Sequence, residues 1–504
     1  MNRSGLVFFM VALASATLLV PSAHAQFTLV KISSDTLKNF DSVHKTEVEP
    51  DFFAWGNTIV GAFHVARIPG PGWGSGDVGW STSTDGGKTW KHGILPGLTD
   101  NYKNGPYKWA ADPSVAYDAK HKQWLISTLP LAGQSNSGLI GDVAVSRSPD
   151  GIHWGKPIII DNTHLDDKNW TTCDNTPKSP FYGNCYTEWD QAFGSQQLLM
   201  STSHDGGLTW SSGIPSADSA VGLGGEPVVQ PNGTVIVPFS GGGIDAFRST
   251  DGGKTWSTTV AISNPVTHQE NGGIRAFVDL PSVAVDGAGR VYVVWWDCSF
   301  RTGCSSNDIV MSTSTDGRNW NLVSRIPIDP KKSTVDHFIA GIGADHATSG
   351  KTARLTVVYY YYPISTCSVP HHPPCQLDVG FTTSQDGGKT WTAGKQLAGP
   401  MQLNWLPMSD AGYMVADYIG VAYTNGNPFG VFEVAKAPSG GVLNEATYTT
   451  KEPLLASPGE PRFSSKGEKP VPGAKSDHEM KFYADDEGRV LIPPSRLIPH
   501  PNQK

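Results

Sequence analysis

The feature that most constrains this chain is a short phrase that recurs six times along it. Each copy begins with Ser, carries an Asp-Gly pair and ends with Trp; the copies are residues 83–90, 148–154, 203–210, 249–256, 314–320 and 384–391. An Asp side chain accepts hydrogen bonds from the backbone that follows it, and Gly adopts the positive φ that tight hairpin turns require. We therefore predict six hairpin turns, and we expect their aspartates to be structural because one active site does not need six copies.

A second pattern precedes these phrases and sets the number of strands. An acidic or polar residue, often followed by Pro, leads into an apolar run, a tight turn and another apolar run, as at 112–126 and 226–237. Two strands followed by a hairpin make a four-stranded antiparallel sheet, and radial repetition of such sheets is a β-propeller. We predict an all-β fold, a propeller with seven blades favoured and six as the alternative. Residues 415–434 begin the seventh blade without a repeat phrase, and residues near Phe27 to Ile32 would complete it.

The two ends of the chain differ from the repeats. Residues 1–25 combine Arg3, an apolar run from Leu6 to Val20 and Ala-His-Ala at 23–25, which is the pattern of a cleaved signal peptide. We therefore predict a secreted or periplasmic protein with a propeller at residues 26–440. The remaining residues, 441–504, are rich in Pro, Gly and Ser, and we expect a mobile tail.

Cysteine content and charge narrow the class further. Six cysteines suit an oxidising compartment, and although they allow about 15 pairings, three local disulfides are the simplest set: 173–185, 298–304 and 367–375. None of these spacings is that of a zinc knuckle. The net charge of −8 disfavours nucleic acid and anionic membranes as partners, and we expect a monomer.

The six phrases resemble the Asp box, also called the BNR repeat, of the sialidase-like superfamily, and the resemblance extends over roughly residues 47–437. It implies that the boxes lie on one rim of the propeller and the ligand site on the other. The ligand-side loops then join the second strand to the third and one blade to the next. Sialidases have six blades, whereas seven blade starts are present here. Asp boxes also occur in lyases and in non-catalytic propellers, so the resemblance alone does not define the reaction.

A sialidase-like hydrolase needs arginines that bind the substrate carboxylate, a Tyr nucleophile beside a Glu, and an Asp acid/base. Arg67, Arg275 and Arg301 lie on predicted ligand-side loops, and Asp77 stands where the family's acid/base Asp usually falls. Arg67-Ile68-Pro69 has the family's R-I-P spelling, but it follows the second strand instead of preceding the first. A surface ion pair between Arg67 and Asp77 is the alternative interpretation.

Other candidates come from the same loops. Tyr361 and Tyr418 compete for the nucleophile, Glu188 is a further catalytic candidate, and Trp189 offers a face on which a sugar could stack. We expect the partner to be an acidic oligosaccharide. His337 supports a second chemistry, because seven-bladed relatives include lyases that split rhamnose from glucuronate with a His or Tyr base.

Acidic residues occupy the predicted blade entrances: Glu49, Asp112, Glu226, Asp279, Asp336 and Asp417. Carboxylates that converge on one axis cannot all be ionised without a counter-charge. They either separate onto arginines and backbone amides or surround Ca²⁺, for which Asp279 and Asp417 are the candidate ligands. The simpler interpretation is that each acid caps its own turn. We assign Asp112 and Glu226 to substrate binding, and no cofactor is required.

The sequence thus supports three functions in order. A secreted glycoside hydrolase acting on a terminal acidic sugar comes first, a uronate lyase second, and a non-catalytic glycan- or protein-binding propeller third. H-E-x-x-H, G-x-S-x-G and phosphate-cradling glycine motifs are absent, so protease, esterase and nucleotide-binding functions have no support.

Overall fold

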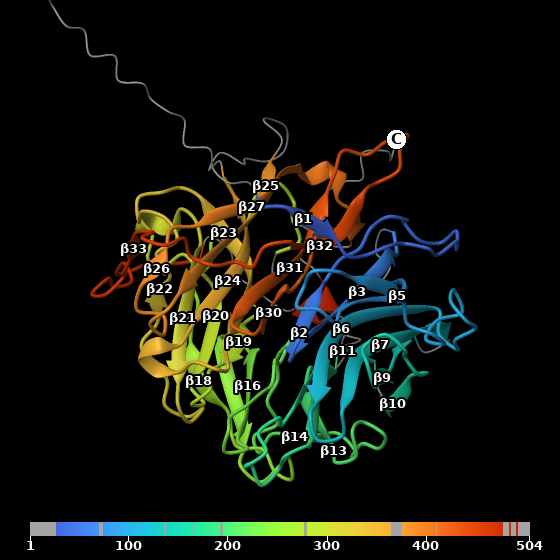
Figure 1. Ribbon diagram of the computed structural model, residues 1–504. Coiled ribbons are helices and arrows are strands. Elements are labelled where there is room, and N and C mark those ends of the chain that lie inside the picture. Colours follow the sequence, from blue (N-terminus) through green and yellow to red (C-terminus); the bar gives the residue numbers. More distant parts are fainter. Residues whose placement is uncertain are drawn as a thin grey trace, which may run out of the picture.

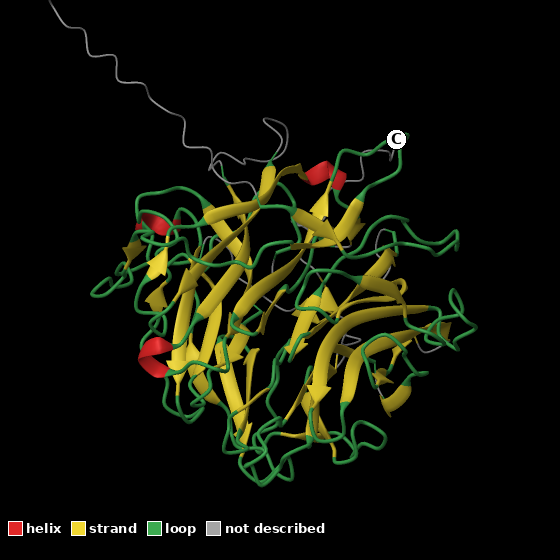
Figure 2. Cartoon of the chain, in the orientation of Figure 1, coloured by secondary structure: helices red, strands yellow, loops and turns green. Residues whose placement is uncertain are grey.

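The computed structural model describes residues 27–69, 74–135, 138–163, 165–191, 195–276, 280–363, 375–409, 411–476, 483–484 and 490–491. Within these ranges the regular structure consists of β-strands and three short 3₁₀ turns, without an α-helix (Figure 2). The predicted all-β class is therefore confirmed. None of the described helices is long and apolar enough to cross a membrane. The signal-peptide prediction concerns residues outside the described ranges.

We use the word unit for four antiparallel strands that pair in order. Units 1 and 2 share a nine-stranded sheet, joined by one pair of residues, Ser75 and Ala110. Unit 1 contains β2 (Asp51–Trp55), β3 (Thr58–Arg67), β4 (Ser75–Ser83) and β5 (Lys91–Ile94). Unit 2 contains β6 (Trp109–Asp118), β7 (Gln123–Ser135), β9 (Val143–Ser148) and β10 (Ile158–Asp161), and β8 (Gly138–Gly141) pairs with β7.

The other units are separate four-stranded sheets. Unit 3 contains β11 (Asp166–Cys173), β12 (Cys185–Gln191), β13 (Leu198–Ser203) and β14 (Ile214–Pro215). Unit 4 contains β15 (Val228–Val229), β16 (Val235–Ser240), β17 (Ile244–Ser249) and β18 (Val260–Ser263). Unit 5 contains β19 (Ser282–Val285), β20 (Val291–Asp297), β21 (Asp308–Ser314) and β22 (Ser324–Arg325). Unit 6 contains β23 (Asp336–Ala344), β24 (Leu355–Tyr362), β25 (Gln376–Ser384) and β27 (Lys395–Gln402).

Unit 7 combines the two ends of the described chain. It contains β30 (Gly420–Thr424), β31 (Asn427–Ala435), β32 (Glu445–Thr450) and, as its fourth strand, β1 (Leu29–Lys31). The register pairs Leu29 with Thr450 and Lys31 with Tyr448. The sheet strand expected near Phe27 to Ile32 is therefore present. However, β32 lies inside the segment predicted as tail; it contains three Thr and one Tyr, which favour strands, and all six of its residues are buried.

Short elements complete the described chain: β26 (Trp391–Thr392) with β33 (Arg462–Phe463), β28 (Met408–Ser409) with β29 (Gly412–Tyr413), β34 (Tyr483–Ala484) with β35 (Val490–Leu491), and the 3₁₀ turns Thr302–Cys304, Gly350–Thr352 and Leu403–Trp405.

The first strands of successive units contact one another around the molecule, from β2 through β6, β11, β15, β19 and β23 to β30, and β30 contacts β2 (Figure 1). Side chains also bond neighbouring first strands. The amide of Val115 donates to Asp51 Oδ2 at 2.7 Å, and that of Val283 donates to Glu226 Oε2 at 3.2 Å. Glu226, predicted to bind substrate, therefore joins unit 4 to unit 5.

The core lies between the units, where apolar residues of adjacent sheets pack face to face. The largest cluster spans units 5 to 7 and includes Phe338, Tyr360 and Phe432, all fully buried. A smaller cluster between units 1 and 2 includes Val60 and Ile126. Each unit therefore buries apolar surface only through its neighbours, as expected for a fold assembled from repeated sheets.

All six Asp boxes connect the third and fourth strands of units 1 to 6. In the first box the Asp85 carboxylate accepts hydrogen bonds from Ser83 Oγ at 2.8 Å and from the amide of Thr89 at 2.9 Å. The Trp90 indole N–H donates to the Gly87 carbonyl at 3.2 Å. Hydrogen bonds from Thr89 hold the pKa of Asp85 at about 2. These local contacts support the predicted structural role of the box aspartates.

Two of the three predicted disulfides are present, Cys173–Cys185 and Cys298–Cys304. Cys375 is disulfide-bonded, and its predicted partner Cys367 lies outside the described residues. The Cys298–Cys304 bond closes the loop that carries Arg301, a residue predicted to bind substrate.

Beyond unit 7, the described part of the predicted tail up to residue 476 packs on units 5 and 6. β33 pairs with β26, and Glu460 forms an ion pair with Lys395 at 2.6 Å. Further along, the Val471 amide donates to the Ser299 carbonyl at 2.7 Å, and Ser476 Oγ accepts from the Thr267 amide at 3.1 Å. Residues 460–476 therefore run along these units instead of extending from the last sheet.

Three glutamates are fully buried where the N-terminal segment joins unit 7: Glu47, Glu433 and Glu445. Burial raises the pKa of Glu47 to about 8, although Lys31 lowers it and Asp35 raises it further. Burial and the neighbouring glutamates raise the pKa values of Glu433 and Glu445 well above the ordinary range. Burial therefore favours the protonated, neutral forms of these three side chains.

This arrangement predicts alkaline sensitivity. The raised pKa of Glu47 contributes stability that is present below about pH 4.5 and is lost as the pH rises through about 8. We compare the unfolding free energy of the Glu47→Gln variant with that of the parent, by urea denaturation at pH 5 and at pH 9. The difference between variant and parent should shift in favour of the variant by a few kcal/mol from pH 5 to pH 9. The exposed Glu452→Gln should show no such difference. Parallel curves for parent and Glu47→Gln would contradict the assignment.

Candidate functional site

Three residues near the first strands of units 1, 2 and 3 adopt the left-handed backbone region although none is glycine: Glu49 with φ 54°, Asp112 with φ 45° and Lys168 with φ 48°. Bulges interrupt the strand register beside Asp112 and Lys168. Such conformations cost about 1–3 kcal/mol each and persist where the surrounding structure imposes them, often at functional sites. The side chains of all three residues meet at one point.

That point is the ammonium group of Lys168. Its Nζ lies 2.6 Å from Asp417 Oδ2, 3.4 Å from Asp112 Oδ1 and 3.5 Å from Glu49 Oε1. Burial alone would lower the pKa of Lys168, but the carboxylates of Asp112, Asp417 and Glu49 raise it well above its ordinary value. One lysine therefore neutralises carboxylates that come from units 1 and 2 and from the segment before unit 7.

Asp417 has a second cationic partner. Arg275 donates from Nε to Asp417 Oδ1 at 2.7 Å and from Nη2 to Oδ2 at 2.5 Å, a bidentate pair. Burial opposes ionisation of Asp417, but Arg275 and Lys168 hold its pKa far below the ordinary value. We call Glu49, His64, Asp112, Lys168, Arg275 and Asp417 the Lys168 cluster.

His64 connects two acids of the cluster. The Asp112 amide donates to His64 Nε2 at 2.7 Å, and the same nitrogen lies 3.0 Å from Glu49 Oε2. Because Nε2 accepts from the amide, the arrangement favours a proton on Glu49. Burial raises the pKa of Glu49 to about 7, against the effect of Lys168. Lys168 in turn holds the pKa of Asp112 well below its ordinary value despite burial.

The counter-charge that the acidic blade entrances require is thus supplied by Lys168 and Arg275. With Asp112 and Asp417 ionised and Glu49 protonated, the charges in the cluster balance. Asp417 was a candidate Ca²⁺ ligand, but both of its oxygens contact cationic side chains. Asp279, the other candidate ligand, lies outside the described residues.

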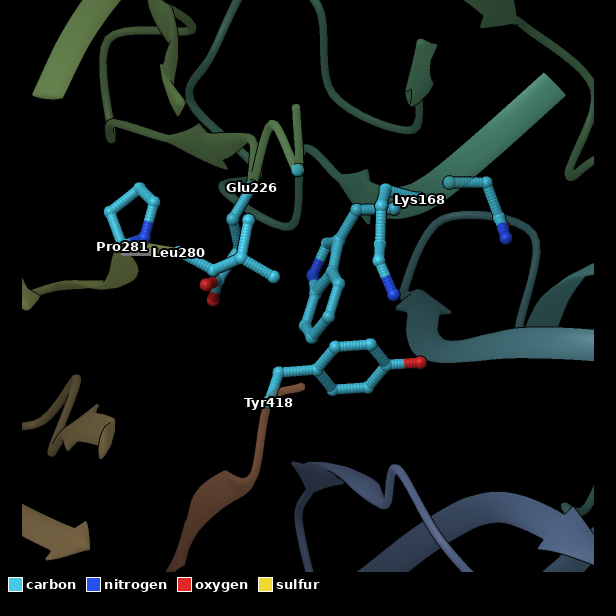
Figure 3. A pocket seen from close by; sticks show the side chains of 8 residues that line it. Lys168, Glu226, Leu280, Pro281 and Tyr418 are labelled. Carbon is cyan, nitrogen blue, oxygen red and sulfur yellow. The ribbon is translucent and has the colours of Figure 1, made fainter. Parts of the chain in front are cut away.

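A small pocket adjoins the cluster (Figure 3). Its lining residues are Lys168, Asn169, Trp170, Gly224, Glu226, Leu280, Pro281 and Tyr418. The Trp170 and Tyr418 rings meet edge to face at 5.0 Å, and Lys168 Nζ lies 5.9 Å from the Tyr418 ring centre. The cavity volume is about 20 Å³, which holds about one water molecule. A sugar ring is therefore larger than the enclosed part of this pocket.

Tyr418 is the predicted nucleophile that the structure places beside the cluster. Its hydroxyl donates to the Pro113 carbonyl at 3.1 Å. Burial, followed by the charges of Glu49 and Asp112, raises its pKa well above the ordinary value, so the phenol is neutral. Tyr361 lies elsewhere, on β24 opposite His337 of β23, and the two rings stack at 6.1 Å.

The three predicted substrate arginines are not brought together as one group. Arg67 is buried, and its Nη1 donates to the carbonyls of Ile68 at 3.3 Å and Gly74 at 2.5 Å, while its Nε contacts Met414 Sδ at 3.3 Å. Met414 precedes Asp417 by three positions, so Arg67 lies beside the segment that carries Asp417.

Arg301 belongs to a different ionic group. Its guanidinium pairs with Asp308, Nε to Oδ2 at 2.8 Å and Nη2 to Oδ1 at 2.5 Å, and with Asp329 at 2.7 Å. Arg325 binds the same two aspartates. Nη1 of Arg301 donates to the Ser333 carbonyl at 2.6 Å, and the side chain is 1% exposed. Such a guanidinium has little surface left for a substrate carboxylate.

The remaining predicted residues are enclosed by the protein. Asp77 accepts hydrogen bonds from Thr99 Oγ1 at 2.5 Å and from the Val78 amide at 2.8 Å, and burial raises its pKa to about 7. Asp77 and Arg67 are both buried, which argues against a surface ion pair. Glu188 lies against Gly225, and Trp189 packs in an apolar cluster without exposure.

Sequence reasoning missed Lys168 as the central cation. Its signal was present, because Lys168 occupies the blade-entrance position of unit 3 that Glu49 and Asp112 occupy in units 1 and 2. A basic residue at one of several acidic entrances is the counter-charge that the acids need.

The structure predicts that Arg301 acts on stability. The Arg301→Ala variant leaves the buried Asp308 and the partly exposed Asp329 with fewer partners, and breaking a buried pair such as Arg301–Asp308 costs about 3–5 kcal/mol. Arg290, which makes one contact of 3.4 Å with Thr313 at the opposite end of unit 5, provides the control. Thermal denaturation should show a large loss for Arg301→Ala and a small one for Arg290→Ala. Equal losses would mean that the Arg301 ion pairs contribute little.

Comparison with known proteins places the chain in a family. The model described as BNR repeat-like domain matches residues 141–398. No curated protein sequence matches the chain. Similar solved structures include a Dyadobacter fermentans protein of unknown function (16% identity, 71% of this chain and 99% of that chain, TM-score 0.43). Others are the NanB sialidase of Streptococcus pneumoniae (14%, 84% and 70%, TM-score 0.41) and the Trypanosoma rangeli sialidase (12%, 84% and 57%, TM-score 0.43). The family match, together with the six Asp boxes, confirms the resemblance: the chain belongs to the BNR repeat-like domain family of the sialidase-like superfamily.

Proposed function

We propose that the seven units are the blades of a β-propeller that β1 closes by pairing with β32, and that the protein is an exported glycoside hydrolase acting on a terminal acidic sugar. The ring of contacts between first strands supports the propeller. The signal-peptide pattern and the two described disulfides support export. No cofactor takes part in the proposed reaction.

The observation that carries the proposal is the setting of Arg275. Its side chain is 15% exposed, it already binds a carboxylate in bidentate geometry, and that carboxylate belongs to Asp417, the neighbour of Tyr418. Trp170 lies against the Tyr418 ring. A cation shaped for a carboxylate beside a phenol and an indole is the combination that recognition and attack of an acidic sugar require.

The proposed mechanism uses Tyr418 as the nucleophile. Its neutral phenol attacks the anomeric carbon without the repulsion that a carboxylate nucleophile would experience from the substrate carboxylate. The phenol proton passes to the ionised carboxylate of Asp112 as the Tyr–carbon bond forms. The bond from the anomeric carbon to the leaving oxygen breaks, and that oxygen takes the proton of Glu49, whose pKa of about 7 keeps a proton available. Water then attacks the anomeric carbon and gives a proton to Glu49, while the Tyr–carbon bond breaks and the phenolate takes its proton back from Asp112, which restores the starting state.

A uronate lyase is the second candidate, and the count of seven units favours it because sialidases have six blades. Arg275 would hold the uronate carboxylate, and Tyr418 or His64 would remove the adjacent proton. The same residues would then carry a β-elimination in place of a substitution.

The product distinguishes these functions. On a panel of sialylated and uronate-containing glycans, the hydrolase proposal predicts a free acidic sugar without an absorbance rise at about 235 nm, the mark of an unsaturated elimination product. Arg275→Ala should lower kcat/KM about ten- to hundredfold, as expected for a lost bidentate charged contact, and Arg290→Ala should not. A rise in absorbance would establish the lyase, and no turnover of any glycan would leave a binding protein.

Substitution of the two candidate tyrosines tests the nucleophile. Tyr418→Phe removes only the hydroxyl, so kcat should fall by more than about a hundredfold while substrate affinity changes little. Tyr361→Phe, on the face of unit 6 beside His337, should retain kcat within about twofold. The reverse ranking of the two variants would transfer the nucleophile to Tyr361.

A further inference from the structure

We propose that Asp417 is an internal substitute for the substrate carboxylate: it occupies Arg275 in the free protein and is retained by Lys168 when an acidic sugar takes its place. This inference rests on the proposed function and specifies how that site is regulated.

The geometry of Asp417 carries the inference. Its Oδ2 is shared between two cations, 2.5 Å from Arg275 Nη2 and 2.6 Å from Lys168 Nζ. The cations come from different parts of the chain, Arg275 from the segment between units 4 and 5 and Lys168 from β11 of unit 3. A carboxylate held on two sides can leave one partner and keep the other, so its charge is never left unpaired.

Exposure differs within the cluster. The Asp417 side chain is 11% exposed, whereas those of Glu49 and Asp112 are 1% and 5% exposed. Arg275 and Asp417 therefore form the solvent side of the cluster, and Glu49 and Asp112 form its interior. A carboxylate that arrives from solvent meets the Arg275–Asp417 pair first.

Such a displacement would also change the adjoining pocket. As it stands, the pocket holds about one water molecule, and Tyr418, the residue after Asp417, forms part of its wall. Movement of Asp417 away from Arg275 would free the guanidinium and shift this wall in one step. Each of the two carboxylates then keeps one cationic partner, Arg275 for the substrate and Lys168 for Asp417.

Internal competition weakens apparent affinity. If Arg275 is free in only a fraction of molecules, the apparent dissociation constant is the intrinsic constant divided by that fraction. An Arg275–Asp417 pair favoured about tenfold therefore costs about tenfold in affinity for the acidic sugar. Neutral sugars, which do not need Arg275, bear no such cost.

The test is calorimetric titration of N-acetylneuraminic acid and glucuronic acid, with galactose as the neutral reference. Asp417→Asn keeps the shape and removes the competing charge, so affinity for at least one acidic sugar should rise about tenfold while that for galactose stays unchanged. Lys168→Met removes the group that retains Asp417, so acidic-sugar affinity should fall about tenfold. Lys168→Arg should restore it.

Weaker or unchanged acidic-sugar binding by Asp417→Asn would overturn the inference and make Asp417 a positioning residue for Arg275. If circular dichroism shows that Asp417→Asn does not fold, the Lys168 variants decide. Acidic-sugar affinity equal to that of the parent in Lys168→Met overturns the inference, and a loss of affinity that Lys168→Arg restores supports it. If the parent binds no acidic sugar detectably, binding gained by Asp417→Asn supports the inference and its absence overturns it. Failure of the proposed function has a separate signature, which is glycan turnover unaffected by Arg275→Ala.

Discussion

The contact between the Lys168 ammonium and the carboxylates of Glu49, Asp112 and Asp417 is the interaction on which the centre of this structure depends. In the proposed propeller the first strands of several units begin near one place, and acidic residues stand at most of these positions in the sequence. Without a cation, these carboxylates would repel one another in a region that excludes water. Lys168 stabilises this convergence and connects unit 3 to units 1 and 2 and to the segment before unit 7.

The same contact separates the protonation states of chemically similar groups. Asp112 and Asp417 stay ionised because Lys168, and Arg275 for Asp417, favour their charged forms. Glu49, deeper and beside His64, has a pKa raised to about 7 by burial. Carboxyl groups with diverging pKa values in one cluster are the usual basis for acid and base roles. The Lys168 cluster therefore stabilises the fold and also holds the ionised and protonated carboxyl groups that the proposed reaction uses.

Away from the Lys168 cluster, many polar groups are satisfied by local contacts. In the Asp boxes the Ser and Asp side chains form their hydrogen bonds within a few residues, as in the first box, whereas box tryptophans such as Trp256 pack into the core. The Arg301 group likewise resolves its charges locally, with Asp308 and Asp329 on the same side of unit 5. The structure thus contains two kinds of Arg–Asp ion pair. The Arg301–Asp308 pair is shielded from solvent, whereas the Arg275–Asp417 pair is partly exposed to it.

Sequence alone determined the features that depend on neighbouring residues. The Asp-box hairpins, the four-stranded grouping, the two described local disulfides and the strand near Leu29 all follow from short-range patterns of turn residues, alternation and spacing. The acidic blade entrances and their need for a counter-charge were also readable from the chain.

Tertiary structure decided which side chains meet, because contacts between residues such as Lys168 and Asp417, 249 positions apart, depend on how complete units pack around one another. Arg275 and Arg301 have the same kind of loop position in the sequence, yet one faces Asp417 near solvent and the other is enclosed by Asp308 and Asp329. The sequence analysis assigned no role to Lys168. Only the packed units, through left-handed backbone turns at Glu49, Asp112 and Lys168, brought it to the centre of the acids.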